Sequence, residues 1–401
     1  MLRSLWLKLL SPHEWALLLA LVAVVLVTGG IDPQHNYFHN PTASAIDIGR
    51  QAALLGVFAL GAAVVIIAGG IDLSSGAMIA FSATICASVM QVLAPQSVAS
   101  GEFVGYGIAT AAVAAALASG FLVGSLHAWL ITTVRLPPFV ATLATLVGLR
   151  SLARAICQHV TGGSTQIYIS DSTFRYLSTS VWIPVTLFGL LALAMWVLLS
   201  RSVVGRHLYA LGGNEEAARL AGLRTDRLKW LAYCISAMLA SLAGVLYMCD
   251  QGAAAPQTMG LGYELNAIAA AVVGGCSLQG GIGTVAGTVL GVLFLRTVID
   301  AVSKVIKVEA DIYQGLIVGG AVVIAVAFTQ LGHRAGRFFQ GGLGLVAAVN
   351  LSLLTFVLTM LFVPRMAPHL AEHGNSIAAA AGGAVALLLI SLHVIAHVKR
   401  R

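Results

Sequence analysis

The sequence predicts an all-α polytopic membrane protein. Of its 401 residues, 59% are hydrophobic and only 9% are charged, whereas a typical soluble domain carries about 25% charged residues. The mean hydropathy is +0.93, and the apolar residues form runs of about 20, the length at which a helix spans a bilayer. Glycine supplies 43 residues, which suits close helix packing inside a membrane. A water-soluble globular fold is therefore excluded.

Twelve apolar segments are candidate membrane helices. Their centres lie near Val24, Leu60, Thr84, Ala115, Leu146, Leu190, Leu239, Val272, Val292, Ala321, Thr355 and Leu387. The first resembles a signal peptide, but Gly29-Gly30-Ile31-Asp32 is a poor cleavage site, so we expect a retained helix. The segment around Val272 is short and bounded by glycines, so a half-span there would change the count.

Two structural parts are expected. Residues 1–342 form a core of about ten helices with an internal repeat. Residues 343–401 add two transmembrane helices at the C-terminus. The boundary lies in residues 331–342, where Gly-His-Arg-Ala-Gly-Arg interrupts the apolar sequence.

The basic residues predict the orientation. With the N-terminus inside, 14 of the 22 Lys and Arg residues fall on the cytoplasmic side, and 8 fall outside or within spans. Because Lys and Arg are enriched in cytoplasmic loops, both termini and the charged loop 201–229 are predicted to be cytoplasmic. The net charge of +7 is not gathered into one binding face. The expected partner is therefore a lipid bilayer and not a nucleic acid.

A polar segment, Gly69–Gly76 (GGIDLSSG), interrupts a long apolar stretch. A carboxylate at the centre of an inserting helix costs about 2.5–3.5 kcal/mol, so Asp72 is a candidate pathway residue by default. The alternative is that Asp72 caps the next helix by accepting backbone N–H groups of Ser74 or Ser75. A cap at the mouth of a half-helix can serve both purposes.

The same G-G-x-x-L-x-x-G pattern returns 205 residues later, at Gly274–Gly281, with Ser277 in the place of Asp72. Paired glycine-interrupted segments indicate an internal repeat that lines a transport pathway. The alternative is chance recurrence in a glycine-rich chain. The candidate pathway residues are Gly69, Gly70, Asp72, Ser74, Ser75, Gly274, Gly275 and Ser277. Beyond them, Gly283, Gly287 and Gly291 recur every four residues and predict a close helix-packing face.

The charged loop contains a self-contained short helix over Asn214–Gly222. Asn214 is a good N-cap, and Gly222 supplies the stop. The acidic residues of the first turn favour the helix dipole, and Arg219 is expected to pair with Glu215. The alternatives are a solvated loop helix or a helix that docks a partner. The candidate docking residues are Asn214, Glu215, Glu216, Ala217, Ala218, Arg219 and Gly222.

Catalytic and metal-binding roles find little support. His369-Leu370-Ala371-Glu372-His373 matches H-x-x-E-H, but it lies in a short loop after prolines with no obvious third ligand. The sequence contains no Gly-Lys dipeptide, and hence no P-loop for nucleotide phosphates. We expect no enzyme activity, no metal and no bound cofactor, so energy must come from a partner or an ion gradient.

Three runs together resemble the ribose/xylose/galactose-type ABC transporter permeases, of the sugar and branched-chain amino-acid importer permease family. They are GGIDLSSG at 69–76, ALGGNEEAARLAG at 210–222 and GYELNAIAAAVVGG at 262–275. The resemblance covers about residues 15–331. The last two predicted helices, about residues 344–398, have no counterpart in the usual ten-helix pattern.

The resemblance implies a multi-pass permease that imports a monosaccharide across a bacterial cytoplasmic (inner) membrane. In that family two membrane subunits, identical or different, associate with cytoplasmic ATPase subunits that hold ATP and with a periplasmic or extracellular sugar-binding protein. The family's coupling helix, which docks into the ATPase, maps onto Asn214–Gly222.

Two other functions remain open from the sequence. Within the family, the substrate could be a branched-chain amino acid. Outside it, an ion-coupled secondary transporter would use Asp72 as its coupling carboxylate, a reading that predicts several intramembrane acids.

Overall fold

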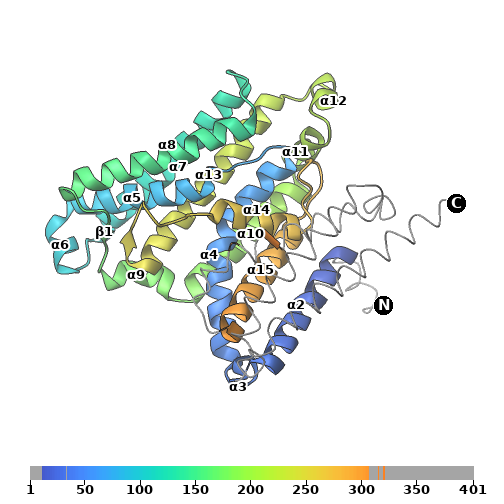
Figure 1. The fold of residues 1–401 in the computed structure, drawn as a ribbon. Helices are drawn as coiled ribbons and strands as arrows, with labels where there is room; N and C mark the ends of the chain where they lie inside the picture. Colours follow the sequence, from blue (N-terminus) through green and yellow to red (C-terminus); the bar gives the residue numbers. More distant parts are fainter. Residues whose placement is uncertain (1–10, 33, 307–314, 316–318, 321–401) are drawn as a thin grey trace, which may run out of the picture. The chain divides into compact units, whose positions relative to one another are not determined.

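The computed structural model describes residues 11–32, 34–306, 315 and 319–320. Its contacts divide the chain into two compact units, residues 1–301 with 311–322, and residues 302–310 with 323–401. The described residues up to Ala301 all belong to the first unit (Figure 1). The predicted boundary near residue 342 and the helices predicted around Ala321, Thr355 and Leu387 lie outside the described residues.

The described chain is almost wholly helical. Its first elements are α2 (Pro12–Ile31), α3 (Asn36–His39), α4 (Pro41–Ile67), α5 (Ser75–Leu93), α6 (Pro95–Ser100), α7 (Tyr106–Thr132) and α8 (Pro138–Thr161). They are followed by β1 (Ile167–Tyr168), α9 (Ser172–Thr179), α10 (Trp182–Trp196), η1 (Val197–Arg201), α11 (Val203–Gly213) and α12 (Glu215–Leu220). The last are α13 (Thr225–Gln251), β2 (Ala253–Ala254), α14 (Tyr263–Val273) and α15 (Val285–Ile306). The two-residue strands β1 and β2 pair antiparallel.

Eight of the described helices are long and apolar enough to cross a membrane. They are α2, α4, α5, α7, α8, α10 with η1, α13 and α15. The predicted all-α polytopic membrane fold is confirmed. The short segment around Val272 forms α14, whose 11 residues fall below the 17 or more that a span requires.

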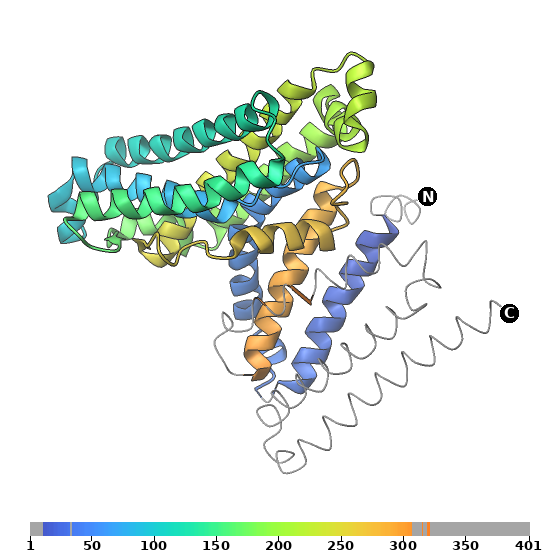
Figure 2. The same cartoon turned by 45° about the horizontal axis from the view of Figure 1, so that its top comes forward.

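Helix α13 is central to the first unit and packs against α4, α5 and α7 (Figure 2). Glycines on the neighbouring helices permit this packing. A Cβ added at Gly61 of α4 would lie 2.8 Å from the Ser236 Cα. A Cβ added at Gly124 of α7 would lie 2.6 Å from the Cys234 Cα. The helices therefore meet at backbone distance, as small residues in membrane helices allow.

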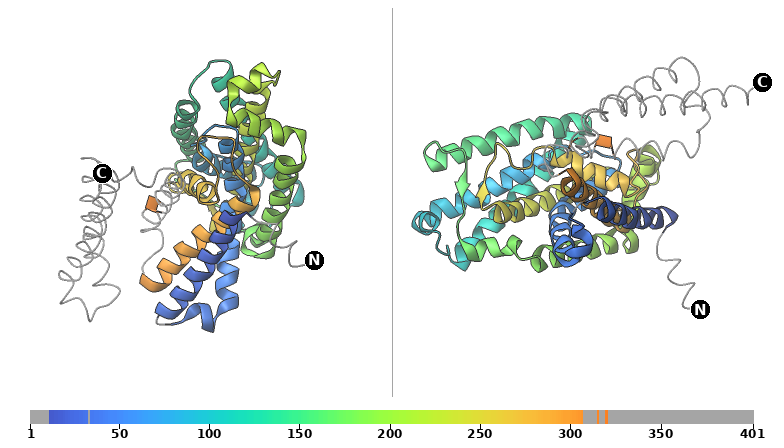
Figure 3. Two further views of the ribbon diagram at one scale, coloured as in Figure 1. Left: turned by 90° about the vertical axis from the view of Figure 1, so that its right-hand side faces the viewer. Right: turned by 60° about the horizontal axis from the view of Figure 1, so that its bottom comes forward.

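The predicted glycine face is found at Gly287 and Gly291 of α15, whereas Gly283 precedes the helix and its added Cβ would meet Cys276 and Ile67. Cβ atoms at Gly287 and Gly291 would overlap the carbonyl oxygens of Gly274 and Ala270, so α14 and α15 are in backbone contact. Helix α2 runs alongside α15 (Figures 1 and 3). The Thr284 hydroxyl, just before α15, donates to Glu14 Oε1 over 2.6 Å, which fastens α2 to this region.

Replacing Gly124 with alanine is expected to lower the melting temperature of the detergent-solubilised protein. The new Cβ must push α7 away from α13, and overpacking of this kind costs about 1–3 kcal/mol. Gly148→Ala in α8 is the matched control, since its Cβ would meet no atom within 4 Å and alanine favours a helix by about 1 kcal/mol. Equal melting temperatures for the two variants would contradict a tight α7–α13 contact.

Candidate functional site

The first repeat loop begins where Gly69 ends α4. Gly69 has a φ of +82°, and its N–H donates to the Ile66 oxygen over 2.9 Å. The Gly70 N–H donates to the Val65 oxygen over 2.9 Å. This pair of bonds is the Schellman motif, in which a left-handed glycine closes the helix.

The second repeat loop begins with the same motif at the end of α14. Gly275 has a φ of +93° and donates to Val272, while Cys276 donates to Ala271, both over 2.9 Å. Gly275 therefore occupies the same position at the end of α14 that Gly69 occupies at the end of α4. This differs by one residue from the predicted sequence register, which paired Gly274 with Gly69.

The aligned residues Asp72 and Ser277 nevertheless form equivalent turns. Asp72 Oδ1 accepts the Ser74 N–H over 2.9 Å, and Ser277 Oγ accepts the Gln279 N–H over 3.2 Å. Both are local turns in which a side chain bonds the backbone two residues on. The hydrogen bonds of Asp72 and Ser277 do not join the two side chains to each other.

Asp72 is buried in the helix bundle, with 3% of its surface exposed. Besides the backbone bond, Oδ1 accepts the Ser74 hydroxyl over 2.6 Å, and Oδ2 accepts the Ser236 hydroxyl of α13 over 2.7 Å. Ser236 lies 11 residues beyond Thr225, the first residue of α13, or about 16 Å along the helix at 1.5 Å per residue. Asp72 thus stabilises the turn in its own loop through Ser74 and also links this loop to the central helix α13 through Ser236.

Two buried side chains on neighbouring helices, His127 and Tyr233, interact electrostatically with this carboxylate. His127 of α7 is fully buried, and its Nε2 lies 2.6 Å from the Thr145 hydroxyl. Its ring meets that of Tyr233 edge to face, with centroids 6.0 Å apart. Ser75, the first residue of α5, is 1% exposed. The loop motif gave no signal for His127, Tyr233 or Ser236, since they lie on other helices.

The predicted capped helix is found as α12. The Asn214 side chain accepts the Ala217 N–H over 2.9 Å. At the other end Gly222 has a φ of +85° and donates to the Arg219 oxygen over 3.0 Å. The Leu223 N–H donates to Ala218 over 3.1 Å, which completes a Schellman motif.

Two expectations for α12 were wrong. Glu215 pairs with Lys229 Nζ over 2.6 Å instead of with Arg219, because the start of α13 brings Lys229 beside it. Ala218 is 5% exposed and packs within the chain, so it is not available to a partner. The exposed apolar side chain is Leu220, at 84% the most exposed large hydrophobic residue in the described part of the chain.

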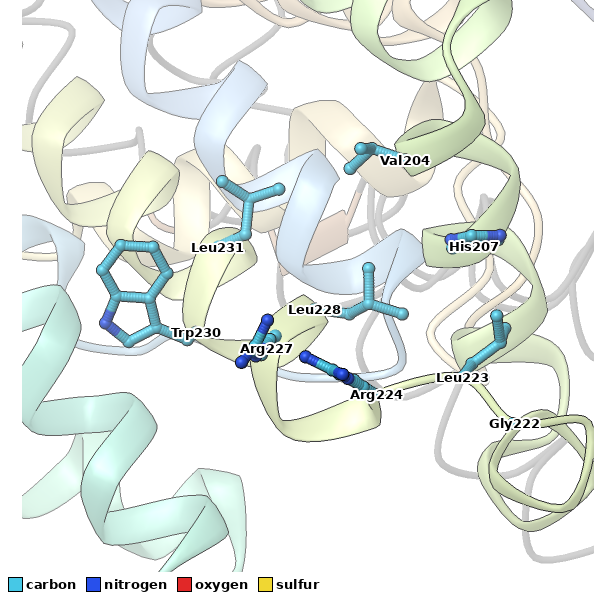
Figure 4. A pocket seen from close by; sticks show the side chains of 9 residues that line it. All are labelled: Val204, His207, Gly222, Leu223, Arg224, Arg227, Leu228, Trp230 and Leu231. Carbon is cyan, nitrogen blue, oxygen red and sulfur yellow. The ribbon is translucent and has the colours of Figure 1, made fainter.

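A groove of about 650 Å³ lies beside α12, between α11 and the start of α13 (Figure 4). Its described lining residues are Val204, His207, Gly222, Leu223, Arg224, Arg227, Leu228, Trp230 and Leu231. The lining combines an apolar floor with two arginines and a histidine, and it includes no carboxylate. It therefore suits an apolar or acidic partner surface.

A bundle of membrane helices with two glycine-stopped loops and a capped polar helix defines a multi-pass transport protein. The model of the family "Branched-chain amino acid transport system / permease component" matches residues 44–328. The chain belongs to this family.

Two curated relatives are similar over most of their length. The ribose import permease protein of Escherichia coli is 34% identical over 285 residues, which cover 69% of this chain and 82% of the relative. The autoinducer 2 import system permease protein of Yersinia pestis is 34% identical over 320 residues, 78% of this chain and 84% of the relative. No solved structure matches. The protein is a membrane permease component of an ABC importer.

Replacing Ser236 with alanine is expected to lower the free energy of unfolding by about 1–3 kcal/mol, because a buried carboxylate oxygen loses its donor from α13. Ser88→Ala is the control. Ser88 is a buried serine of α5 whose hydroxyl has no hydrogen-bond partner in the described structure, so its removal breaks no hydrogen bond and should not lower stability. Denaturant unfolding in mixed micelles measures the free energy of unfolding of both variants. Equal values for the two variants would show that the Ser236–Asp72 bond does not stabilise the fold.

Proposed function

We propose that this permease carries a monosaccharide of the ribose, xylose or galactose class into the cell. The observation that carries the proposal is the 34% identity to a ribose import permease, extending over 82% of that protein. The region that matches the family model, residues 44–328, includes both repeat loops and α12. The family's description keeps a branched-chain amino acid as the second candidate substrate.

The proposed route passes the repeat loops. Asp72 and its polar neighbours form a buried cluster, and polar groups held inside a membrane bundle mark solute or ion routes. We assign Gly69, Gly70, Ser74 and Ser75 to the first loop of this route. Its second loop contains Gly274, Gly275 and Ser277.

The proposed assembly contains a second permease subunit, identical or different, with ATPase subunits and an external sugar-binding protein. ATP resides on the ATPase, and this chain itself catalyses no reaction and holds no metal. The excess of basic residues in the predicted cytoplasmic segments supports an inner-membrane orientation with both termini inside. In this orientation α12 and its groove face the ATPase.

The ATPase is proposed to dock on α12. The helix is closed at both ends by its own caps, so its conformation does not depend on a partner. Leu220 presents an uncovered apolar side chain, and the adjacent groove adds cationic groups. Exposed apolar side chains rimmed by polar groups are typical of protein–protein contacts.

The substrate proposal is tested on the binding protein that co-purifies with the intact importer. We expect mass spectrometry of the ligand released on denaturation to show a monosaccharide. Calorimetric titration of the emptied binding protein should show binding of D-ribose, D-xylose or D-galactose and none of L-leucine. Binding of leucine with no sugar binding would establish the amino-acid alternative.

Replacing Leu220 with glutamate is expected to abolish co-purification of the ATPase and to reduce uptake more than ten-fold. A carboxylate at the centre of an apolar contact loses the burial energy and must also be desolvated. Leu220→Met is the control, since it keeps an apolar side chain of similar volume. Normal assembly and uptake with glutamate at this position would show that α12 is a solvated loop helix.

A further inference from the structure

Three glycine-containing segments meet backbone to backbone at one point of the fold. They are Gly69 after α4, Gly212-Gly213 at the end of α11, and Gly280-Gly281 in the second repeat loop. A Cβ at Gly280 would lie 2.8 Å from the Gly69 Cα and 2.5 Å from the Gly212 oxygen. A Cβ at Gly281 would lie 2.8 Å from the Gly213 Cα. We call these five residues the glycine junction.

Gly212 is the tightest member of the junction. Its added Cβ would overlap the carbonyl oxygen of Ile67, in the last turn of α4, and would lie 2.6 Å from the Gly281 nitrogen. That nitrogen donates to the same Ile67 oxygen over 2.9 Å. The end of α11 is therefore seated directly against a hydrogen bond that joins the two repeats.

A second link ties α11 to the second loop. The Tyr209 hydroxyl donates to the Gly283 oxygen over 2.8 Å. Burial, together with the neighbouring Cys276 thiol, raises the pKa of Tyr209. The phenol therefore remains protonated and keeps its donor at physiological pH.

From this geometry we infer that the glycine junction is the element that transmits displacement of α12 to both repeat loops at once. The inference rests on the proposed docking of the ATPase at α12. Gly213 is followed directly by Asn214, the N-cap of α12, and Gly69 stands three residues before Asp72. Gly212 is then a positioning residue, which touches neither the ATPase nor the solute.

The physical reason is the absence of side chains at the contact. A side chain between two elements can change rotamer and absorb a small movement, whereas backbones in contact cannot interpenetrate. Closely packed contacts transmit small shifts because packed interiors resist compression. Because Gly212 touches both the Ile67 oxygen and the Gly281 nitrogen, and these two atoms are joined by a hydrogen bond, moving α11 must move the end of α4 and the second loop together.

The test follows the second loop while nucleotide acts on the ATPase. A cysteine replaces Leu278, which is 42% exposed, and the five native cysteines are all buried. The complete importer is reconstituted in liposomes with its ATPase outward. The rate of maleimide labelling at position 278 is measured with and without ATP plus vanadate. We expect at least a three-fold change in rate.

The decisive comparison is between two adjacent alanine substitutions. Gly213→Ala should keep the nucleotide response, because its Cβ would meet no atom within 4 Å. Gly212→Ala should retain the bound ATPase but lose the response. Tyr209→Phe, which removes one hydrogen bond and adds no atom, should retain the ATPase and reduce the response at least two-fold.

The two readouts separate this inference from the proposed docking. A Gly212→Ala importer that keeps both the ATPase and the full response overturns the junction's role while docking at α12 stands. Loss of the ATPase from that variant would place Gly212 in docking and would also overturn it. If ATP plus vanadate does not change the labelling rate at position 278 in the importer with Gly212 intact, the junction's role is also overturned. Indifference of ATPase binding to Leu220→Glu contradicts the docking proposal instead.

Discussion

Inside a bilayer, apolar helices gain little from being next to one another instead of next to lipid, so their association depends on how closely their backbones approach. Glycine sets that distance here. Gly61 and Gly124 bring α4 and α7 onto the central helix α13, and Gly287 brings α15 onto α14. The positions of the two repeat loops follow from these contacts, since each loop begins where one of the tightly packed helices stops.

The buried carboxylate of Asp72 depends on the same arrangement. A charged group at membrane depth is costly unless hydrogen bonds replace its hydration. Asp72 receives two donors from Ser74, in its own loop, and one from Ser236 on α13. The third donor exists only because Gly61 lets α4 lie against the Ser236 backbone. Close packing thus makes the polar interior possible.

Local features of the sequence could be predicted because their causes are local. The caps of α12 and the short α14 follow from Asn, Gly and run length within a few residues. The partner of Glu215, the burial of Ala218 and the one-residue offset between the helix stops could not be predicted. They depend on where α13 begins and on how the helices pack, and neither can be derived from the residues of a single segment. The glycine pair at 212–213 was visible, but nothing in its own segment indicated what it contacts.

In the internal repeat, α4 and α14 end with the same motif, but the two loops that follow differ in length and in the helices that they contact. Five residues separate Gly69 from α5, and nine separate Gly275 from α15. The shorter loop turns inward at once and places a carboxylate among the helices. The longer loop has room for Gly280 and Gly281, both with positive φ, and these residues reach the end of α11. The longer second loop therefore contacts the end of α11 through two residues, Gly280 and Gly281. The shorter first loop is held against α13 through Asp72 and meets α11 at Gly69.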